Sequence, residues 1–171
     1  MPGIVHRVAQ RDQALLERLL LSPTASRARR LFWSVVTHAG GVCVSLGISL
    51  APLWLDGSLG EGARRATILL LTSHLLVQVV KRTVSRPRPV LRNPPGIRFP
   101  DRFSFPSGHA AAAASVALGY ASTHTHLAIP MLAAAALVGV SRVVLGMHFP
   151  VDVLVGQLLA VLTAVALAPL L

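Results

Sequence analysis

The stretch 127-LAIPMLAAAALVGVSRVVLGMHFPVDVLVGQLLAVLTAVALAPLL-171 decides the fold class, because it contains two long apolar runs in succession. Arg142 and Asp152 are its only charged residues. The runs cover about residues 127–147 and 151–171, and a membrane-spanning helix needs about 20 mostly apolar residues. The stretch therefore predicts two membrane helices joined by a short polar segment.

Three further segments, about residues 31–55, 66–80 and 109–123, are also apolar enough for membrane helices. The last two are short, since fifteen residues at about 1.5 Å each cover roughly 22 Å of a roughly 30 Å hydrocarbon core. The whole chain, residues 1–171, is thus predicted to be a single all-α domain: a polytopic membrane helical bundle with about five transmembrane helices.

The N-terminal segment, residues 1–30, alternates apolar and charged residues at helical spacing, as in Leu15, Leu16, Glu17 and Arg18. This pattern predicts an amphipathic interfacial helix on the membrane surface, and a helix packed on the ends of the bundle is the alternative. The segment lacks the uninterrupted apolar core of a cleavable signal peptide.

The composition limits the classes of partner. Of the 171 residues, 53% are hydrophobic and 13% charged, and 16 Lys and Arg against 6 Asp and Glu give a net charge of +10. Aromatic residues that could stack on bases make up only 5% of the chain. The balance argues against nucleic acid and favours membrane lipids and a phosphorylated lipid substrate as partners.

A first polar cluster follows the apolar segment 66–80, with Lys81 and then Arg88-Pro89. Lys81 is the only lysine among the 16 cationic residues. His74, Gln78 and Lys81 fall on one helix face at i, i+4 and i+7. A polar stripe in a membrane helix normally faces the interior of the bundle, where it marks a functional path.

Two further clusters have the chemistry of anion binding and nucleophilic catalysis. Pro106-Ser107-Gly108-His109 precedes an alanine-rich run, and the free N–H groups of a helix N-terminus bind anions. In the third cluster, Ser141-Arg142 precedes His148 and Asp152, with Pro150 suited to the first turn of a helix. A carboxylate there can accept a hydrogen bond from one imidazole nitrogen and leave the other as a nucleophile. A structural hydrogen bond or a proton relay is the alternative for such an Asp-His pair.

Together the three clusters resemble the signature of the type 2 phosphatidic acid phosphatase superfamily of lipid phosphate phosphatases: K-x6-RP, PSGH and SR-x5-H-x3-D, here within a catalytic signature region at 81–152. The resemblance implies that His148 attacks phosphorus to form a phosphohistidine, that Asp152 orients it, and that His109 is the general acid and base. It also implies a set of phosphate-binding residues: Lys81, Arg88, Ser107, Gly108 and Arg142. Supporting positions are Pro89, Pro106, Ser141 and His74.

The resemblance implies a metal-independent enzyme with no cofactor, because three cations and a helix N-terminus neutralise the phosphate. The matched residues contain one carboxylate and no Cys, a poor ligand set for Mg²⁺. The implied reaction is hydrolysis of a lipid phosphomonoester or diphosphate, such as a polyprenyl phosphate, phosphatidic acid or phosphatidylglycerol phosphate. The compact chain also resembles actinobacterial phosphatases of decaprenylphosphoryl-phosphoribose. A lipid phosphotransferase and a catalytically silent lipid-binding or translocating protein remain alternatives, and the oligomeric state is open.

The side of the bacterial cytoplasmic membrane that carries the site is also open. Family members commonly have a first span before the amphipathic segment, and this chain is expected to lack it, which places its N-terminus on the side of the site. The family's usual side is extracytoplasmic. Six arginines before residue 31, seven cations in residues 81–102 and Arg142 share the site's side, against Arg64 and Arg65 opposite, and this count favours the cytoplasm.

Overall fold

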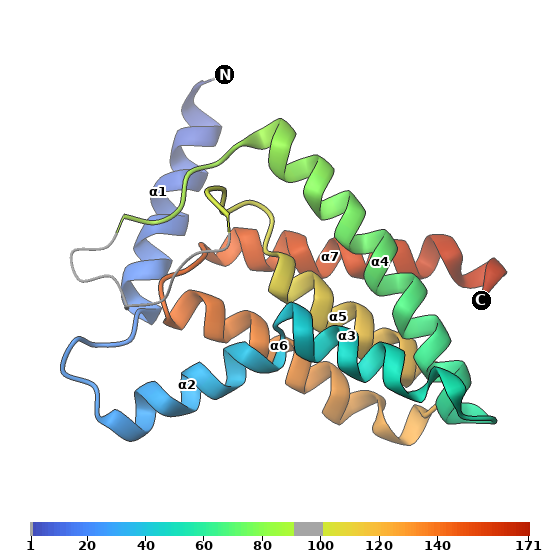
Figure 1. The fold of residues 1–171 in the computed structure, drawn as a ribbon. Helices are drawn as coiled ribbons and strands as arrows, with labels where there is room; N and C mark the ends of the chain where they lie inside the picture. Colours follow the sequence, from blue (N-terminus) through green and yellow to red (C-terminus); the bar gives the residue numbers. More distant parts are fainter. Residues whose placement is uncertain (1, 91–100) are drawn as a thin grey trace.

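The computed structural model describes residues 2–90 and 101–171, and these are helical apart from turns, loops and one isolated β-bridge (Figure 1). The prediction of an all-α fold is confirmed. The helices are α1 (Pro2–Leu19), α2 (Arg27–Ala39), α3 (Val42–Leu50), α4 (Ser58–Val84), α5 (Gly108–Ala121), α6 (Ala128–Val144) and α7 (Pro150–Leu167), with short 3-10 turns η1 (Ala51–Trp54), η2 (Thr125–Leu127) and η3 (Ala168–Leu170).

Within the described residues, three helices are long and apolar enough to cross a membrane: Ser58–Val84, Thr125–Val144 and Pro150–Leu170. The last two confirm the runs predicted at 127–147 and 151–171. The prediction of a short span at 66–80 is wrong, because α4 has 27 residues. In its polar first turns Glu61 pairs with both Arg64 and Arg65 at 2.7 Å.

The span predicted at 31–55 is broken into α2 and α3 with η1, which are bent by 48°. Gly40 ends α2 and Gly41 precedes α3, and a Cβ at Gly40 would overlap the Val138 side chain of α6. Counted as one span, the bent pair brings the number in the described chain to four. Helix α5 has only 14 residues, so the count of five spans stays a prediction.

Helix α5 lies at the centre of the bundle, in contact with α4, α6 and α7. Its seam with α4 is built from small and apolar residues: Ala63, Ala66 and Leu70 against Ala112, Val116 and Tyr120. Small residues let membrane helices approach closely, and polar side chains bond across them. The Oγ atoms of Ser73 and Ser115 do so at 2.7 Å. Leucines on α4 and α7, such as Leu75 and Leu154, are exposed on the outer surface, as expected for side chains that face lipid.

Helix α1 packs at the end of the bundle where α4 ends and α7 begins (Figure 1). Leu16 is buried with Ala110, Val143 and Val153, and the Leu21 N–H donates to the Val144 carbonyl at 2.8 Å. The structure thus shows the packed arrangement, and a position of α1 on the membrane surface stays a prediction. Arg92 and Arg98, two of the cations counted above, lie outside the described residues.

Candidate active site

The third polar cluster lies at the start of α7, where local sequence sets its geometry. Pro150 occupies the first turn, and the Asp152 carboxylate accepts the Phe149 N–H at 2.9 Å, as predicted for a helix that begins here. The Ser107 N–H donates to the Asp152 carbonyl at 2.9 Å. This contact needs Gly156, because a Cβ there would overlap the Ser107 carbonyl. The second cluster is thereby held against the third.

His148, in the α6–α7 loop, is buried and has its two ring nitrogens in different surroundings. Its Nδ1 lies 2.7 Å from the Ser104 carbonyl oxygen and 3.6 Å from Asp152 Oδ2. A carbonyl oxygen can only accept, so the proton is assigned to Nδ1 and Nε2 keeps its lone pair. Nε2 lies 3.4 Å from Arg88 Nη1. The Ser104 carbonyl thus takes the place predicted for the Asp152 carboxylate, which already accepts from Arg86 Nη1 at 2.7 Å.

The surroundings of His148 keep its imidazole neutral near pH 7. Burial lowers the pKa of His148 to about 4. The Asp152 carboxylate opposes this shift, and the Arg142 and Arg88 guanidiniums add to it. A neutral imidazole with a free lone pair on Nε2 has the protonation state that a nucleophile requires.

The end of α4 and the following loop position two of the three predicted cations. Lys81 lies in the last turn of α4, and Ser85, with a φ of 49°, ends the helix. The prolines after it favour an extended chain, and Pro87 forms the isolated bridge with Phe103. The Ser104 N–H also donates to the Arg86 carbonyl at 2.8 Å. The two ends of the loop are thus joined beside Lys81.

Arg142 supplies the third cation from the last turn of α6. It is 2% exposed, and its Nη1 donates to Thr37 Oγ1 of α2 at 2.7 Å. Its Nε is buried and has no partner within the described residues. A buried donor of this kind is costly unless it is satisfied, and an oxygen of a bound anion could satisfy it.

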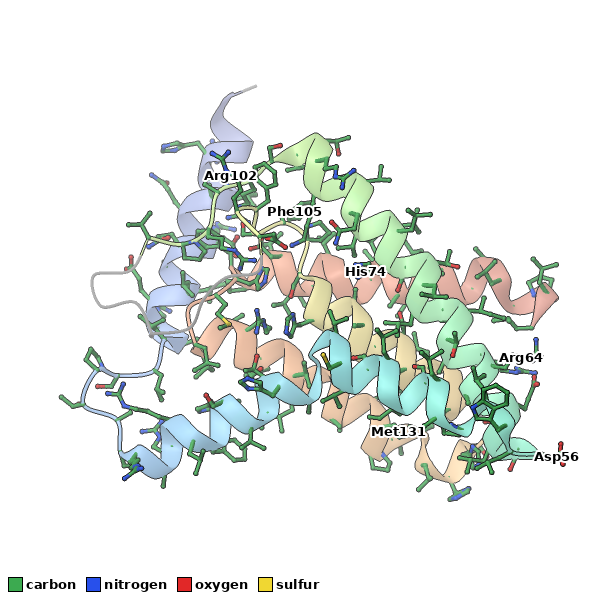
Figure 2. The ribbon with its side chains drawn as sticks, in the orientation of Figure 1. Asp56, Arg64, His74, Arg102, Phe105 and Met131 are labelled. Atoms are coloured by element: carbon green, nitrogen blue, oxygen red, sulfur yellow. The ribbon has the colours of Figure 1, made fainter. Side chains whose placement is uncertain are left out.

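Seven of the twelve predicted site residues line one cavity of about 450 Å³: His74, Lys81, Arg88, Gly108, His109, Arg142 and His148. From these residues the cavity continues along α4 past Gln78 and His74 to Leu70 and Leu71. Figure 2 labels His74 on α4, between Arg64 near the start of the same helix and Phe105 in the loop that precedes α5. The stripe predicted on this helix therefore faces the interior.

The other predicted residues lie behind the lining. Ser107 caps α5, with its Oγ accepting the Ala110 N–H at 3.4 Å. Ser141 is buried and its Oγ donates to the Val138 carbonyl. Pro89 and Pro106 are buried in the loop, and Asp152 is buried beneath His148.

Asp101 is a site residue that the sequence analysis missed. Its carboxylate lies 2.6 Å from Lys81 Nζ and 2.8 Å from Arg88 Nη2, and its carbonyl accepts from Arg88 Nε at 3.0 Å. Burial alone would raise the pKa of Asp101, but Lys81 and Arg88 lower it, so the group is ionised. Because Asp101 lines the cavity, the site contains a carboxylate that is not among the matched signature residues. Its position five residues before Pro106 was the only feature of the sequence that could have placed it near the site.

Within residues 2–90 and 101–171, no group of three or more His, Cys, Asp or Glu side chains is arranged to hold a metal ion.

Comparison with curated proteins finds decaprenylphosphoryl-5-phosphoribose phosphatases. The relative from Mycolicibacterium smegmatis is 36% identical over 109 residues, which cover 58% of this chain and 58% of that protein. The relative from Mycobacterium tuberculosis strain H37Rv is 33% identical over 132 residues, 71% of this chain and 68% of that protein. The match to the first thus spans less than two thirds of its length.

Two solved structures share the fold. A transmembrane PAP2 type phosphatidylglycerolphosphate phosphatase from Bacillus subtilis aligns with a TM-score of 0.74 and 27% identity, covering 94% of this chain and 86% of that one. LpxE from Aquifex aeolicus aligns with a TM-score of 0.73 and 23% identity, covering 90% and 92%.

The family model described as the PAP2 superfamily matches residues 63–171, more than half of the chain and all three polar clusters. With the fold shared with PAP2-type membrane phosphatases, this match shows that the chain is a membrane protein of the PAP2 superfamily.

Proposed function

We propose that this protein hydrolyses the phosphate of a membrane lipid, in a bacterial cytoplasmic membrane, through a phosphohistidine on His148. The observation that carries the proposal is the single cavity in which this histidine, three cations and an apolar extension meet. A soluble phosphate ester would need only the cations. The continuation of the cavity along α4 to Leu70 and Leu71 fits a substrate that keeps its hydrocarbon chain in the membrane.

In the first step, His148 Nε2 attacks phosphorus, so that a P–N bond forms as the P–O bond to the lipid breaks. His109, which lines the same cavity at the N-terminus of α5, donates a proton to the departing oxygen. Burial and the neighbouring cations lower the pKa of His109 to about 3, and the negative charge of the bound phosphate would raise it for this role. Lys81, Arg88 and Arg142 stabilise the equatorial oxygens of the transferring group, together with the Gly108 N–H. The positive charge that develops on His148 is stabilised by Asp152, 3.6 Å from Nδ1.

In the second step, His109 takes a proton from a water molecule whose oxygen attacks phosphorus. The P–N bond breaks, inorganic phosphate leaves, and His148 returns to its neutral state. The same residue serves as acid and then as base, so both steps need only the side chains described here. The proposed reaction uses no metal ion, because the three cations supply the positive charge.

The polar stripe on α4 supports a phosphorylated sugar as the headgroup of the lipid. Gln78 Nε2 and His74 Nε2 are 3.1 Å apart, and Gln78 Oε1 accepts no hydrogen bond from a described residue. A plain polyprenyl phosphate would place hydrocarbon beside this pair, which leaves polar groups unsatisfied at a cost. A sugar between the phosphate and the lipid would offer hydroxyl groups there. The relatives named for decaprenylphosphoryl-5-phosphoribose agree with this substrate class.

Purified protein in detergent should therefore release phosphate from a polyprenylphosphoryl-5-phosphoribose with kcat/KM at least about 10-fold above that for polyprenyl phosphate or phosphatidic acid, a difference of roughly 1.4 kcal/mol. The measurement is the rate of release of inorganic phosphate from each lipid, with the three lipids at the same mole fraction in detergent micelles. Equal kcat/KM values for all three lipids would refute the proposed sugar headgroup and would still support phosphatase activity. Transfer of the phosphoryl group to a second lipid without phosphate release would identify a phosphotransferase.

Vanadate should inhibit this reaction competitively, and EDTA should leave the rate unchanged. Vanadate adopts the trigonal-bipyramidal shape of the transferring phosphoryl group, and a site complementary to that shape binds such a mimic tightly. The check is a set of initial rates at several lipid and vanadate concentrations, repeated after dialysis against EDTA. A loss of activity that Mg²⁺ restores would show that a metal ion takes part.

A further inference from the structure

Helix α1 places a buried carboxylate next to the proposed catalytic residues. Asp12 is 2% exposed, whereas its neighbours Arg11 and Gln13 are exposed. Its Oδ2 accepts from Arg86 Nη2 at 2.8 Å, and its Oδ1 accepts the Val151 N–H at 3.0 Å. Both partners come from outside α1: one from the loop after α4, the other from the first turn of α7. Burying a carboxylate is costly unless it is paired and hydrogen-bonded, and here it is both.

Arg86 joins Asp12 to Asp152. Its Nη1 donates to Asp152 Oδ1 at 2.7 Å, while its Nη2 donates to Asp12. The guanidinium also lies 3.9 Å from the centroid of the Phe149 ring, which fixes its plane. Asp152 is fully buried and Arg86 largely so. Two carboxylates thus share one guanidinium, and the group as a whole carries one negative charge.

That charge matters for the reaction proposed above, on which this inference rests. When His148 Nε2 bonds to phosphorus, its imidazole becomes positively charged. Arg86 alone would cancel the charge of Asp152, so the pair would offer the imidazole little stabilisation. Asp12 restores a net negative charge, and in a buried site the interaction is weakly screened. We propose that Asp12 is a positioning residue for phosphoryl transfer: it holds Arg86 and offsets its charge, so that Asp152 stays effective towards His148.

Asp12 could instead have a purely structural role, because it also accepts a hydrogen bond from the first turn of α7. The two roles predict different results for a variant that keeps this hydrogen bond and loses the charge. The substitution Asp12→Asn separates the two roles. The amide keeps nearly the same volume and an oxygen that can accept the Val151 N–H, but it carries no charge. Leu16 and the Leu21–Val144 hydrogen bond still hold α1 on the bundle. Glu17→Gln is the matched control, since Glu17 lies on the same helix, is exposed and accepts a hydrogen bond from Gln13 of that helix.

The experiment measures kcat, KM and the thermal unfolding midpoint of the full chain, with polyprenylphosphoryl-5-phosphoribose (the phosphosugar lipid) as the substrate. The parent is compared with Asp12→Asn, Glu17→Gln, Asp152→Asn and the double variant Asp12→Asn/Asp152→Asn. We expect Asp12→Asn to lower kcat about 5-fold with little change in KM, and Glu17→Gln to match the parent. In the Asp152→Asn background, the same change should alter kcat less than about 2-fold, because it acts through Asp152.

A 5-fold loss in both backgrounds, or a loss that follows a lower unfolding midpoint, would overturn the role of Asp12 in positioning. An Asp12→Asn variant with the parent's kcat would do the same. A parent chain that releases no phosphate from any lipid phosphate would instead overturn the proposed function. The two failures are therefore distinguishable.

Discussion

Replacing His148 by alanine should lower phosphate release by at least about 1000-fold, roughly 4 kcal/mol of transition-state stabilisation. The reason is that the proposed intermediate contains a covalent bond between His148 Nε2 and phosphorus, which alanine cannot form. Nε2 of His148 lies beside Arg88, and its other nitrogen is held by the Ser104 carbonyl at 2.7 Å. In the proposed mechanism His109 cannot replace it, because it protonates the leaving group. The measurement is turnover of the phosphosugar lipid, with the thermal unfolding midpoint in detergent as the check that the variant is folded.

A trapping experiment adds a direct readout. Rapid mixing of the parent with a ³²P-labelled lipid and alkaline quenching should leave label on the protein, since phosphohistidine survives base, and His148→Ala should carry none. His126→Ala is the control, because His126 is exposed in η2 and outside the cavity. Substantial turnover by a folded His148→Ala variant would exclude the phosphohistidine mechanism.

The parts of this fold that could be predicted are those set by local sequence. The apolar runs at 127–147 and 151–171 correspond to α6 and α7, because a bilayer demands continuous apolar helices. Pro150 and Asp152 occupy the first turn of α7 as their types predict. His74, Gln78 and Lys81 face one cavity because helical spacing puts them on one side of α4. Each of these conclusions needs only a window of a few turns.

What could not be predicted depends on contacts between distant segments. Asp12 lies 139 residues from Val151 along the chain, and its helix carries charged residues at many positions, so nothing local distinguishes it from a solvated carboxylate. The Ser104 carbonyl that binds His148 is a backbone group, which no residue type identifies. At the break, Gly40 lies against Val138 of α6, and in the polar start of α4 Glu61 pairs with Arg64. Helix propensity and hydropathy carry no information on contacts of this kind.

The second large effect should come from Lys81→Arg, which keeps the charge and changes the shape of the cation. Lys81 is 5% exposed, with its Nζ 2.6 Å from Asp101 Oδ2 and 3.4 Å from the Phe103 carbonyl. An ammonium is a compact point charge that fits between these oxygens, whereas a guanidinium is a wider planar fork. In a closely packed interior the extra volume has to displace neighbours, and Asp101 also holds Arg88. The change would therefore disturb two of the cations that are proposed to bind phosphate.

We expect Lys81→Arg to lower kcat/KM for the phosphosugar lipid about 30-fold, or roughly 2 kcal/mol, in a protein that still folds. Arg82→Lys is the control: Arg82 is the next residue of α4, is exposed and lies outside the cavity, so the reverse exchange there should change kcat/KM less than about 2-fold. The 30-fold loss follows from geometry, since both variants conserve charge. If Lys81→Arg turned over like the parent, the position would supply charge alone. The single lysine in a chain otherwise rich in arginine would then have no catalytic explanation.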